Sequence, residues 1–572
     1  MRRFLEFLFL SSVVIISSCN RDEVITTALP PEIILDDGGI YSVKQGDEIR
    51  LAPRYERADD ATFEWVIENN IVCTERAYVF YGESLGEYFI TLTVTTAAGS
   101  ASEELKVEVV EPEIPTVSIN GDKELTLAVG SERLFEATLR ETSLDTSVEW
   151  LCNGKSVSNT LSYNFVAESV GRYEVVVKAS NADGEADDSI VIDVLNEEDM
   201  PFIYTFPKSE YHSVVGRKLR IMPNAISDSE GVTYTWSVDG VEQEGITTPH
   251  FVFRGESAGT HTLAVTAEAL RGSSKVTLSH NFAITIYDEA AFRRTADASS
   301  LAEASCVVEY RPAPGQFIGD TKTGGFDGTE LTKERAAEYA LQRLNDGKFV
   351  SLGAFGGYIV VGFDHSIACS NDYDFEVIGN SFDGSSEPGV VWVMQDENGN
   401  GMADDTWYEL RGSETGAATT IQEYAVTYYR PSGKGMPVAW SDSEGKSGTI
   451  DYLESFHNQA SYYPAWITES SYTLRGTRLE ARNYDSSGNG SMWILPAYGW
   501  GYADNFSEED LLEGTAQKRA NAFRISNAID FEGETVKLSH IDFVKVQCAI
   551  QAKSGWIGEV STEVLGIRDH NL

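Results

Sequence analysis

The chain has few cysteines, a shortage of basic residues and, beyond its N-terminus, no long apolar run. Each of these shortages argues against a class of function. Its 572 residues include six cysteines, with no C-x-x-C pair and no clustering with histidine, which argues against zinc and iron–sulfur sites. Lys and Arg total 44 against 89 Asp and Glu, and the net charge of −45 would repel nucleic-acid phosphates and anionic lipid head groups. The composition therefore argues against nucleic-acid binding. Five of the cysteines lie in apolar contexts that favour buried free thiols: Cys73, Cys152, Cys306, Cys369 and Cys548.

Motifs of the common catalytic classes are also missing. The sequence contains no G-x-S-x-G elbow, no H-E-x-x-H and no phosphate-binding loop, and His365, His457 and His540 lie far apart along the chain. Carboxylate pairs for glycoside hydrolysis stay open as an alternative, because acids are plentiful and the required separation of roughly 5–9 Å is invisible in a sequence. The sequence therefore predicts a protein that is not an enzyme.

The N-terminus has the pattern of a bacterial lipoprotein signal. Arg2 and Arg3 precede an apolar run from Phe4 to Ile16, and small residues then lead to Cys19. The run is too short to span a bilayer as a helix, whereas this order of features is typical of a cleaved signal whose cysteine is acylated. We expect lipidation at Cys19. The alternative is an uncleaved apolar helix with an incidental cysteine.

A short charged segment follows the cysteine. Asn20, Arg21, Asp22 and Glu23 resemble the export tag with which some gut-dwelling Gram-negative bacteria place lipoproteins on the outer face of the outer membrane. The resemblance implies a lipid-anchored protein of the outer membrane that faces outward, at the cell surface.

Residues 27–288 repeat one pattern three times, at a period of 85 to 88 residues. Each copy has an alternating strand that ends in tryptophan and, 21 to 23 residues later, a glycine that leads through one residue to a ring and a second alternating strand. A period of two with turn residues between short strands predicts an antiparallel β-sandwich. Asn153-Gly154 and Asp239-Gly240 predict type I′ hairpin turns. The landmarks are Trp65 with Gly86, Trp150 with Gly171, and Trp236 with Gly259.

This repeat resembles the PKD family of immunoglobulin-like domains, whose signature is a strand ending in tryptophan and a later glycine-x-tyrosine strand start. The family's Asp-Phe-Gly-Asp-Gly after the tryptophan is absent here, so the copies are divergent and PKD-like. The resemblance implies spacing and protein or glycan contact, without catalysis. We expect the three tryptophans in the domain cores, since each lies on a strand that must bury one face.

The remaining residues, 289–572, have another character. Residues 332–346 have helical periodicity, with Thr332 as the expected cap and Gly347 as the expected stop. The rest reads as strands and long loops, which predicts one β-sandwich of jelly-roll type with a helix packed outside it. The expected fold class is mostly β: three tandem immunoglobulin-like sandwiches and this larger domain. The expected organisation is signal peptide and lipobox 1–19, export tag and linker 20–26, PKD-like domains 27–112, 113–198 and 199–288, and a ligand-binding domain 289–572.

A calcium-type loop follows one of the strands of this domain. Oxygen-bearing residues stand at positions 1, 3, 5 and 9 of the loop, with glycine at 6 and a backbone carbonyl available at 7, which is the spacing that wraps one hard cation. Trp407 replaces the glutamate expected at position 12, and Asp405 or Glu409 could supply that carboxylate. A structural calcium ion is the prediction, and a polar hairpin loop is the alternative. The predicted ligands are Asp396, Asn398, Asn400, Met402 and Asp404.

Segments around this loop look like the C-terminal domain of PKD-repeat surface lipoproteins of gut Gram-negative bacteria. Some lipoproteins of that organisation capture cobalamin (vitamin B12) for a TonB-dependent transporter, and the resemblance implies that role here. The segments that carry the resemblance are 362–365, 374–382, 386–389, 405–410, 541–546 and 558–564.

Aromatic residues in glycine- and proline-rich stretches are the candidate ligand contacts, because loops on a rigid sandwich concentrate binding residues. Rings with amide and hydroxyl neighbours suit the face of a sugar or the edge of a corrin ring, and the alternative is a core or inter-sheet cluster. These residues are His457, Tyr462, Tyr463, Trp466, Trp493, Tyr498, Trp500 and Tyr502.

The sequence as a whole predicts a surface lipoprotein that captures a ligand. A corrinoid is the leading ligand. The second alternative is a carbohydrate, bound by the protein as an accessory to polysaccharide uptake, and the third is adhesion through the spacers. The expected partners are that ligand, a TonB-dependent transporter and the membrane through the lipid anchor.

Overall fold

The computed structural model describes residues 28–140, 142–227, 231–289, 291–515 and 518–572. The predicted signal, Cys19 and the charged tag lie outside these residues. The chain divides between Glu113 and Ile114 into two compact units, of which the first holds one β-sandwich and the second holds the remaining domains. Among the described residues, no helix combines the length and apolar character needed to cross a membrane.

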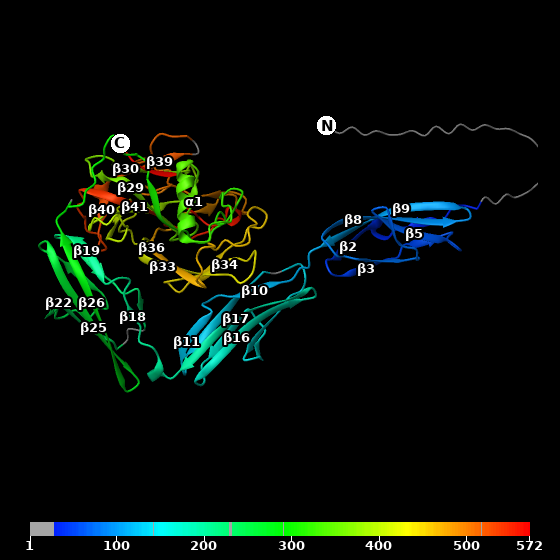
Figure 1. The fold of residues 1–572 in the computed structure, drawn as a ribbon, viewed down its shortest axis with the longest axis horizontal. Coiled ribbons are helices and arrows are strands. Elements are labelled where there is room, and N and C mark those ends of the chain that lie inside the picture. The colour runs from blue at the N-terminus through cyan, green and yellow to red at the C-terminus, as the bar shows by residue number, and fades with distance from the viewer. Residues whose placement is uncertain (1–27, 141, 228–230, 290, 516–517) are drawn as a thin grey trace, which may run out of the picture. The chain divides into compact units, whose positions relative to one another are not determined.

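Three β-sandwiches of one design follow each other along the chain, coloured from blue to green in Figure 1. The first consists of β1 (Glu32–Ile34), η1 (Asp36–Gly39), β2 (Ile40–Lys44), β3 (Glu48–Leu51), β4 (Arg54–Glu56), β5 (Thr62–Ile67), β6 (Asn70–Cys73), β7 (Tyr78–Tyr81), β8 (Gly86–Thr96) and β9 (Gly99–Val110). The second consists of β10 (Thr116–Ile119), β11 (Glu124–Ala128), β12 (Glu132–Arg140), β13 (Ser147–Cys152), β14 (Lys155–Ser158), β15 (Ser162–Val166), β16 (Gly171–Asn181) and β17 (Gly184–Leu195). The third follows η2 (Glu197–Asp199) and consists of β18 (Tyr204–Thr205), β19 (Glu210–Val214), β20 (Lys218–Ile221), β21 (Ala225–Ile226), β22 (Thr233–Val238), β23 (Val241–Glu242), β24 (Phe251–Arg254), β25 (Gly259–Arg271) and β26 (Ser274–Tyr287).

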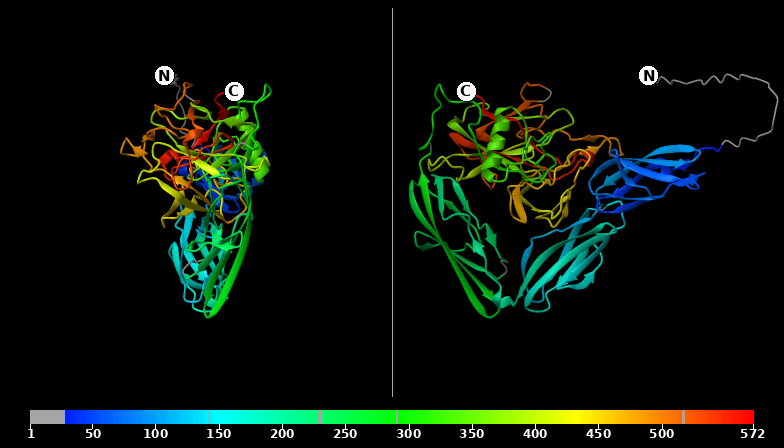
Figure 2. Two further views of the ribbon diagram at one scale, coloured as in Figure 1. Left: turned by 90° about the vertical axis from the view of Figure 1, so that its left-hand side faces the viewer. Right: turned by 45° about the vertical axis from the view of Figure 1, so that its right-hand side comes forward.

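The same five-stranded sheet recurs in each sandwich, ordered β2-β9-β8-β5-β6, β11-β17-β16-β13-β14 and β19-β26-β25-β22-β23. Its two longest strands form a hairpin, which in the third sandwich is the pair β25 and β26 visible in Figure 2. One edge departs from the antiparallel prediction, because the first strand of each sheet runs parallel to the last one, as β2 does beside β9. The chain enters each domain on the other sheet, where β1 pairs with β4, and then crosses over, so its next strand arrives parallel to the closing strand.

The repeat landmarks have the roles that the sequence predicts. Trp65, Trp150 and Trp236 are each 0% exposed at the centre of a separate core. Each indole Nε1 donates a hydrogen bond of 2.9–3.0 Å to a backbone carbonyl, so the buried donor is satisfied. Asn153-Gly154 and Asp239-Gly240 have positive φ at both residues, which confirms the type I′ turns.

The C-terminal domain is a larger β-sandwich. Its elements are β27 (Cys306–Arg311), α1 (Lys333–Asn345), β28 (Val350–Ser351), β29 (Tyr358–Ala368), β30 (Phe375–Gly379), β31 (Gly389–Met394), β32 (Trp407–Leu410), β33 (Ile421–Tyr429), β34 (Val438–Asp442), β35 (Ser447–Ile450), β36 (Ser471–Arg478), β37 (Tyr484–Asp485), β38 (Trp493–Ile494), β39 (Arg519–Phe523), η3 (Ile525–Asn527), β40 (Ala528–Ile529), β41 (His540–Cys548), η4 (Gly555–Ile557), β42 (Glu563–Val564) and β43 (Gly566–Asp569). A six-stranded sheet, β27-β29-β41-β31-β32-β40, shares one large core with the sheets β35-β34-β33-β36 and β39-β30-β43. The predicted mostly β fold is confirmed.

Helix α1 packs on the outside of this domain, as predicted (Figure 1). The side chain of Thr332 accepts a hydrogen bond from the backbone N–H of Arg335, which caps the first turn. Gly347 follows the helix at φ +60°, a conformation that favours glycine and ends the helix. The buried face includes Tyr339 and Ala340, so the helix is held by packing on the sandwich.

The cysteines of the described chain are free thiols. Cys548 is buried, as its apolar context predicts, but Cys306 is exposed. Cys73, Cys152 and Cys369 are half-buried, because each lies at the end of a strand or just beyond one.

Candidate functional site

One face of the six-stranded sheet is apolar and packs on the core, and the opposite face carries charged and aromatic side chains. Val544 and Val546 of β41 point into the core, so Lys545 between them points to the opposite face. Antiparallel pairing places Val360 of β29 and Trp392 of β31 on either side of Lys545, and Glu409 of β32 beside Trp392. A lysine, a tryptophan and a glutamate therefore lie in one row across the centre of the sheet.

The ammonium group of Lys545 is surrounded by aromatic rings. Its Nζ lies 4.6 Å from the ring centroid of Trp392, 5.5 Å from that of Trp407 and 5.6 Å from that of Tyr358. These distances are within the range of cation–π attraction. No hydrogen bond or ion pair within the described chain engages this Nζ. The charge is thus surrounded by rings and has no ion-paired carboxylate, although Glu409 attracts it from a greater distance.

Burial shifts the pKa values of the two titratable groups in this row, Lys545 and Glu409. It lowers the pKa of Lys545 to about 8, because desolvation disfavours the charged ammonium, and it raises the pKa of Glu409 to about 7. The Glu409 carboxylate accepts a hydrogen bond from the hydroxyl of Thr477, which fixes its orientation. Near neutral pH a small change in surroundings, such as a bound ligand, can therefore change the charge of either group.

The row lies in a cleft of about 360 Å³ that also takes residues from the third sandwich. Its other cations have partners: Arg220 is paired with Glu423 at 2.7 Å, and Arg475 donates to the carbonyl of Glu423 at 2.9 Å. Lys218 is likewise paired with an acid, and Lys208 donates to the backbone carbonyl of Asp404. Lys545 is therefore the cation of this cleft that is free to meet an incoming anion.

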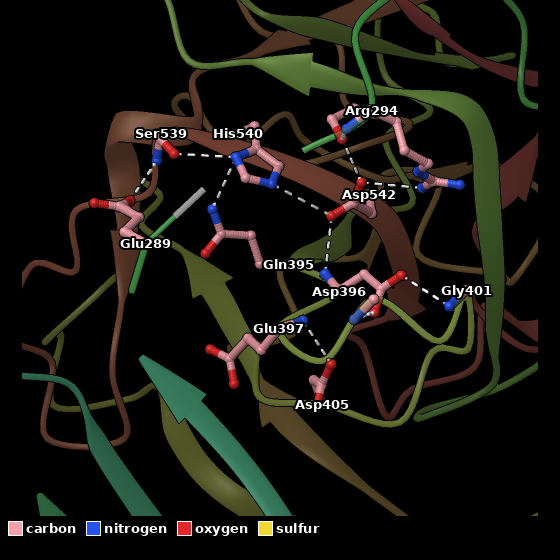
Figure 3. A network of polar contacts seen from close by, with 12 residues as sticks. Glu289, Arg294, Gln395, Asp396, Glu397, Gly401, Asp405, Ser539, His540 and Asp542 are labelled. Atoms are coloured by element: carbon pink, nitrogen blue, oxygen red, sulfur yellow. Dashed lines mark hydrogen bonds and ion pairs between the residues drawn. The ribbon is translucent and has the colours of Figure 1, made fainter. Parts of the chain in front are cut away.

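The predicted calcium loop connects β31 to β32, the strands that carry Trp392 and Trp407. Figure 3 shows Asp396, Glu397, Gly401 and Asp405 of this loop. Both carboxylate oxygens of Asp396 accept hydrogen bonds from backbone N–H groups of residues 399–401, at 2.8–3.1 Å. The side-chain oxygens of Asn398 and Asn400 each accept from the N–H two residues further on. The Asn400 amide donates to Asp404. The loop oxygens come together in one turn, but they also satisfy the turn itself, as in a polar hairpin loop.

The carboxylate that the loop spacing lacks can now be assigned. Glu409 is excluded because it lies on the sheet, bonded to Thr477. Asp405 lies in the loop, where its Oδ2 accepts from the N–H of Glu397 at 2.7 Å and its buried Oδ1 has no hydrogen-bond partner. Burial and the nearby acids raise the pKa of Asp405 to about 6. Hard oxygen donors fit calcium, and an orphaned buried oxygen is what an ion would satisfy. Met402 is 58% exposed and could contribute only its carbonyl.

A buried polar network fixes the base of this loop (Figure 3). Asp542 of β41 is fully buried and accepts from the N–H of Asp396 at 2.8 Å and from the Arg294 guanidinium at 3.0 Å. Glu397 is 3.1 Å from the guanidinium of Arg217 in the third sandwich. Burial nevertheless raises the pKa of Glu397 to about 8. The loop is therefore tied to β41 and to the preceding sandwich at once.

The predicted contacts at 462–466 are core residues. Tyr462, Tyr463 and Trp466 are 1%, 4% and 5% exposed and belong to the main core. Both tyrosine hydroxyls donate to backbone carbonyls, at 2.9 and 3.0 Å. Their burial favours the core alternative, and these rings offer no surface to a ligand. Proline and glycine near them indicated loops correctly, but the loops fold inward.

The predicted contacts between 493 and 502 form a smaller cluster. Tyr498 and Tyr502 are buried in a satellite core, and their rings are 6.0 Å apart. Trp493 and Trp500 are half-buried, and the Nε1 of Trp493 has no hydrogen-bond partner. None of these four residues lines the cleft around Lys545.

His457 is the predicted contact that does line a cavity. Its ring lies edge-on to Phe317, with centroids 4.9 Å apart, and both line a second cavity of about 300 Å³. The exposed rings of Phe456 and Trp556, 6.2 Å apart, stand at the same cavity. None of the other seven predicted residues lines this cavity, although the hydroxyl of Tyr462 donates to the carbonyl of His457.

Lys545 and Trp392 are absent from the predicted site residues, and Glu409 appears there only as a possible carboxylate for the calcium loop. A signal for one of them existed: Lys545 interrupts an otherwise apolar strand, and a charge in such a strand must face away from the core. No comparable signal marks Trp392 or Glu409, because their meeting depends on the order of strands in the sheet.

The first repeat matches a known family. Residues 30–96 match the PKD-like domain family, in agreement with the pattern found in the repeats. A search of curated proteins finds no match. The comparison supports an immunoglobulin-like domain in this chain and goes no further toward a function.

Solved structures with similar folds are tandem immunoglobulin-like or fibronectin-like domains. The I-band fragment I67–I69 of titin is 14% identical, with a TM-score of 0.22, over 46% of this chain and 99% of that fragment. The fibronectin(III)-like modules of CbhA from Clostridium thermocellum are 14% identical, with a TM-score of 0.18, over 30% of this chain and 98% of theirs. The three N-terminal domains of the outer capsid protein Hoc of bacteriophage RB49 are 13% identical, with a TM-score of 0.21, over 43% of this chain and 96% of theirs. With TM-scores of 0.18 to 0.22, these likenesses carry no argument about this chain.

Proposed function

We propose that this protein captures a ligand at the cleft around Lys545, as a lipid-anchored protein at the outer face of a bacterial outer membrane. The observation that carries the proposal is the unpaired ammonium of Lys545 among the rings of Trp392, Trp407 and Tyr358. Desolvating a cation without an anionic partner costs stability. Such a cost is expected where the missing partner belongs to a ligand.

The cleft favours a ligand with an anionic group next to a flat apolar surface. The chain carries a net charge of −45, so an anion is repelled by most of the surface and is attracted only where a cation is uncompensated. The tryptophan rings supply flat contact area, and the carboxylate of Glu409 can accept from a hydroxyl or an amide.

A corrinoid is the leading ligand. Cobalamin combines a flat ring system, a fringe of amides and one phosphodiester. The ring system would stack on the aromatic rings of the cleft, an amide would donate to Glu409, and the phosphodiester would pair with Lys545. A cleft of about 360 Å³ would hold one part of so large a molecule, and the rest would lie over its open mouth. Delivery to a TonB-dependent transporter is part of this proposal. It rests on the resemblance of segments between residues 362 and 564 to the C-terminal domain of PKD-repeat surface lipoproteins, some of which capture cobalamin.

An acidic glycan is the second candidate. Tryptophan rings that face a cleft are suited to stacking on sugar rings, and a uronic acid or sulfate group would form an ion pair with Lys545. Neutral glycans lack the anion and should bind less tightly. The immunoglobulin-like domains are also consistent with adhesion, in which the cleft would have no ligand.

Isothermal titration of the chain from residue 20 onward tests these ligands. Cyanocobalamin, a uronic-acid oligosaccharide and its neutral counterpart are titrated in turn, against the native chain and against Trp407→Ala. Heat with cyanocobalamin that Trp407→Ala abolishes supports capture of a corrinoid, and heat with the acidic glycan alone supports the second candidate. Silence with all three contradicts ligand capture at the cleft and leaves adhesion as the better proposal.

The proposed anchor has its own test. Metabolic labelling with a fatty acid should place label on the wild-type protein and none on Cys19→Ala, which should appear in the soluble fraction. Protease added to intact cells should degrade the wild-type protein if it faces outward. Protection from protease would contradict the outward orientation while leaving lipidation intact.

A further inference from the structure

Three carboxylates from distant parts of the C-terminal domain converge beside the cavity that His457 lines, and two of them, Glu387 and Glu563, line it. Glu387 precedes β31, Asp504 lies in the long loop before β39, and Glu563 begins β42. One oxygen from each lies within 4.8 Å of the others. Asp504 and Glu563 are 1% and 3% exposed, so the cluster is enclosed by protein.

Each carboxylate is held in place by the surrounding backbone or side chains. Asp504 accepts from the N–H of Asn380 at 2.9 Å and from the N–H of Glu563 at 3.0 Å. Glu387 accepts from the N–H of Ser561 at 3.1 Å, and Glu563 accepts from the hydroxyl of Ser561 at 2.9 Å. Since a carboxylate offers about four lone-pair positions, several acceptor positions stay free on the three groups.

The cluster has no basic counterpart. Within the described chain, none of the three carboxylates forms an ion pair with lysine, arginine or histidine. Burial raises the pKa of all three groups; repulsion by Glu387 adds to the shifts of Asp504 and Glu563, whereas the acid that repels Glu387 is Glu559. Three such groups this close together require either protons or a cation to offset their charge.

A fourth acid supplies an independent sign of an absent partner. Glu559 is 3% exposed and lines the same cavity as Glu387 and Glu563. Its Oε1 accepts from the N–H of Gln316 at 2.8 Å, but its buried Oε2 has no hydrogen-bond partner. A buried acceptor left unsatisfied is costly, so something that the chain does not itself provide is expected beside it.

We propose that Glu387, Asp504 and Glu563 bind one divalent cation, with Glu559 facing the same cavity. Carboxylate oxygens from a rigid frame select hard cations, so the ion is calcium, magnesium or manganese in preference to zinc. The site is separate from the loop 396–405, and it does not depend on the ligand proposed for the Lys545 cleft. The cavity leaves the ion reachable from solvent past the rings of Phe456 and Trp556.

Terbium and calcium binding to the full chain from residue 20 onward tests this site. The Asp396→Asn chain removes the loop carboxylate, so the ion that remains reports on the cluster alone. After chelator treatment and dialysis, this chain should bind one Ca²⁺ per molecule by titration calorimetry. It should also bind Tb³⁺ with emission excited through tryptophan. Glu563→Gln added to it should abolish both signals, whereas Glu508→Gln, an exposed acid near Asp504, should leave them unchanged.

Two outcomes overturn the proposal. The first is an Asp396→Asn chain that is folded by circular dichroism and binds neither Ca²⁺ nor Tb³⁺. The second is a Glu563→Gln chain that is folded and still binds one ion. If Glu563→Gln does not fold, Trp556→Phe decides instead: the Tb³⁺ emission should fall several-fold with the Ca²⁺ stoichiometry unchanged, and undiminished emission places the ion elsewhere.

Discussion

The three N-terminal sandwiches and the C-terminal domain differ in what they bury. Within the described part of the sandwiches, the buried charged side chains are Asp188 and Arg217, whereas the C-terminal domain buries acids throughout, including Glu409, Asp504 and Glu563. Their tryptophans differ in the same way. Those of the sandwiches are fully buried with satisfied indoles, while the Nε1 of Trp392 is buried without a partner. The sandwiches therefore bury few charged groups, whereas the C-terminal domain buries acids of both proposed sites.

The largest expected effect lies in the sandwiches. Trp150→Ala should lower the free energy of unfolding of the second sandwich by about 3–5 kcal/mol, because it empties the centre of that core. Denaturant unfolding followed by circular dichroism measures the loss. Ligand binding by the C-terminal domain should be unchanged, and a loss of both would show that the spacers take part in the site.

Arg217 is the exception among the sandwiches, because it is buried against Glu397 of the loop. Arg217→Met should destabilise the C-terminal transition by about 3 kcal/mol, since it leaves a buried carboxylate without its partner. The double variant Arg217→Met, Glu397→Leu should recover most of the loss in thermal melts. Arg254→Met, at an exposed pair with Glu256, is the control and should change nothing measurable. An equal effect at both arginines would contradict the special role of Arg217.

Lys545→Met should raise the free energy of unfolding, whereas the two preceding substitutions lower it. The ring cage accepts a methionine side chain, and the burial of an unpaired charge ends, so stability at pH 7 should rise by about 1–2 kcal/mol. Ligand binding should be lost at the same time. Chemical unfolding and titration calorimetry on one preparation check both. A variant that is less stable and still binds would remove Lys545 from the site.

The pH dependence of the stability of the native chain tests the same cost of burying the Lys545 ammonium. The pKa of Lys545 is about 8 in the folded chain, against the usual 10.5, so below pH 8 both states carry the proton and the burial cost is present in full. Between pH 8 and 10.5 the unfolded chain binds more protons than the folded one, and stability should rise with pH through that window. Lys545→Met should lack this rise when melting is compared at pH 7.5 and 9.5. A rise of equal size in both chains would assign it to another group.

The smallest expected effect is that of calcium on the loop. If the loop binds calcium, removing the ion with a chelator should lower the stability of the C-terminal domain by about 1 kcal/mol, seen as a shift of a few degrees in melting temperature. The sandwiches should melt unchanged. Asp396→Asn is the matched variant, since it should lose only the part of the shift that the loop contributes. An Asp396→Asn chain with the full shift would refute an ion in this loop.

The sequence predicted those parts of the molecule that depend on neighbours in the chain. The sandwich landmarks at Trp150 and Gly154 and the cap at Thr332 are local, because strand alternation, positive φ and helix capping are set within a few residues. The parallel edge of each sheet was missed, since the path of the chain between two sheets leaves no local mark.

The candidate sites depend on contacts between distant residues, which explains why they escaped prediction. Lys545 and Trp392 meet through the register of β41 and β31. Burial was also invisible: Tyr462 looked like a contact residue because of its loop-like surroundings, but its loop folds into the core. His457, predicted from the same loop-like surroundings, lines a cavity, and its role as a ligand contact stays a prediction.

The most direct test of ligand capture at the cleft is the reactivity of Lys545 toward acetic anhydride at pH 8, mapped by mass spectrometry with and without the bound ligand. With the pKa of Lys545 near 8, its amine is reactive at that pH, and the proposed site predicts that a saturating ligand lowers its acetylation at least ten-fold. Lys155, exposed on the second sandwich, should react equally in both samples. Saturating ligand with undiminished acetylation of Lys545 would contradict capture at this cleft.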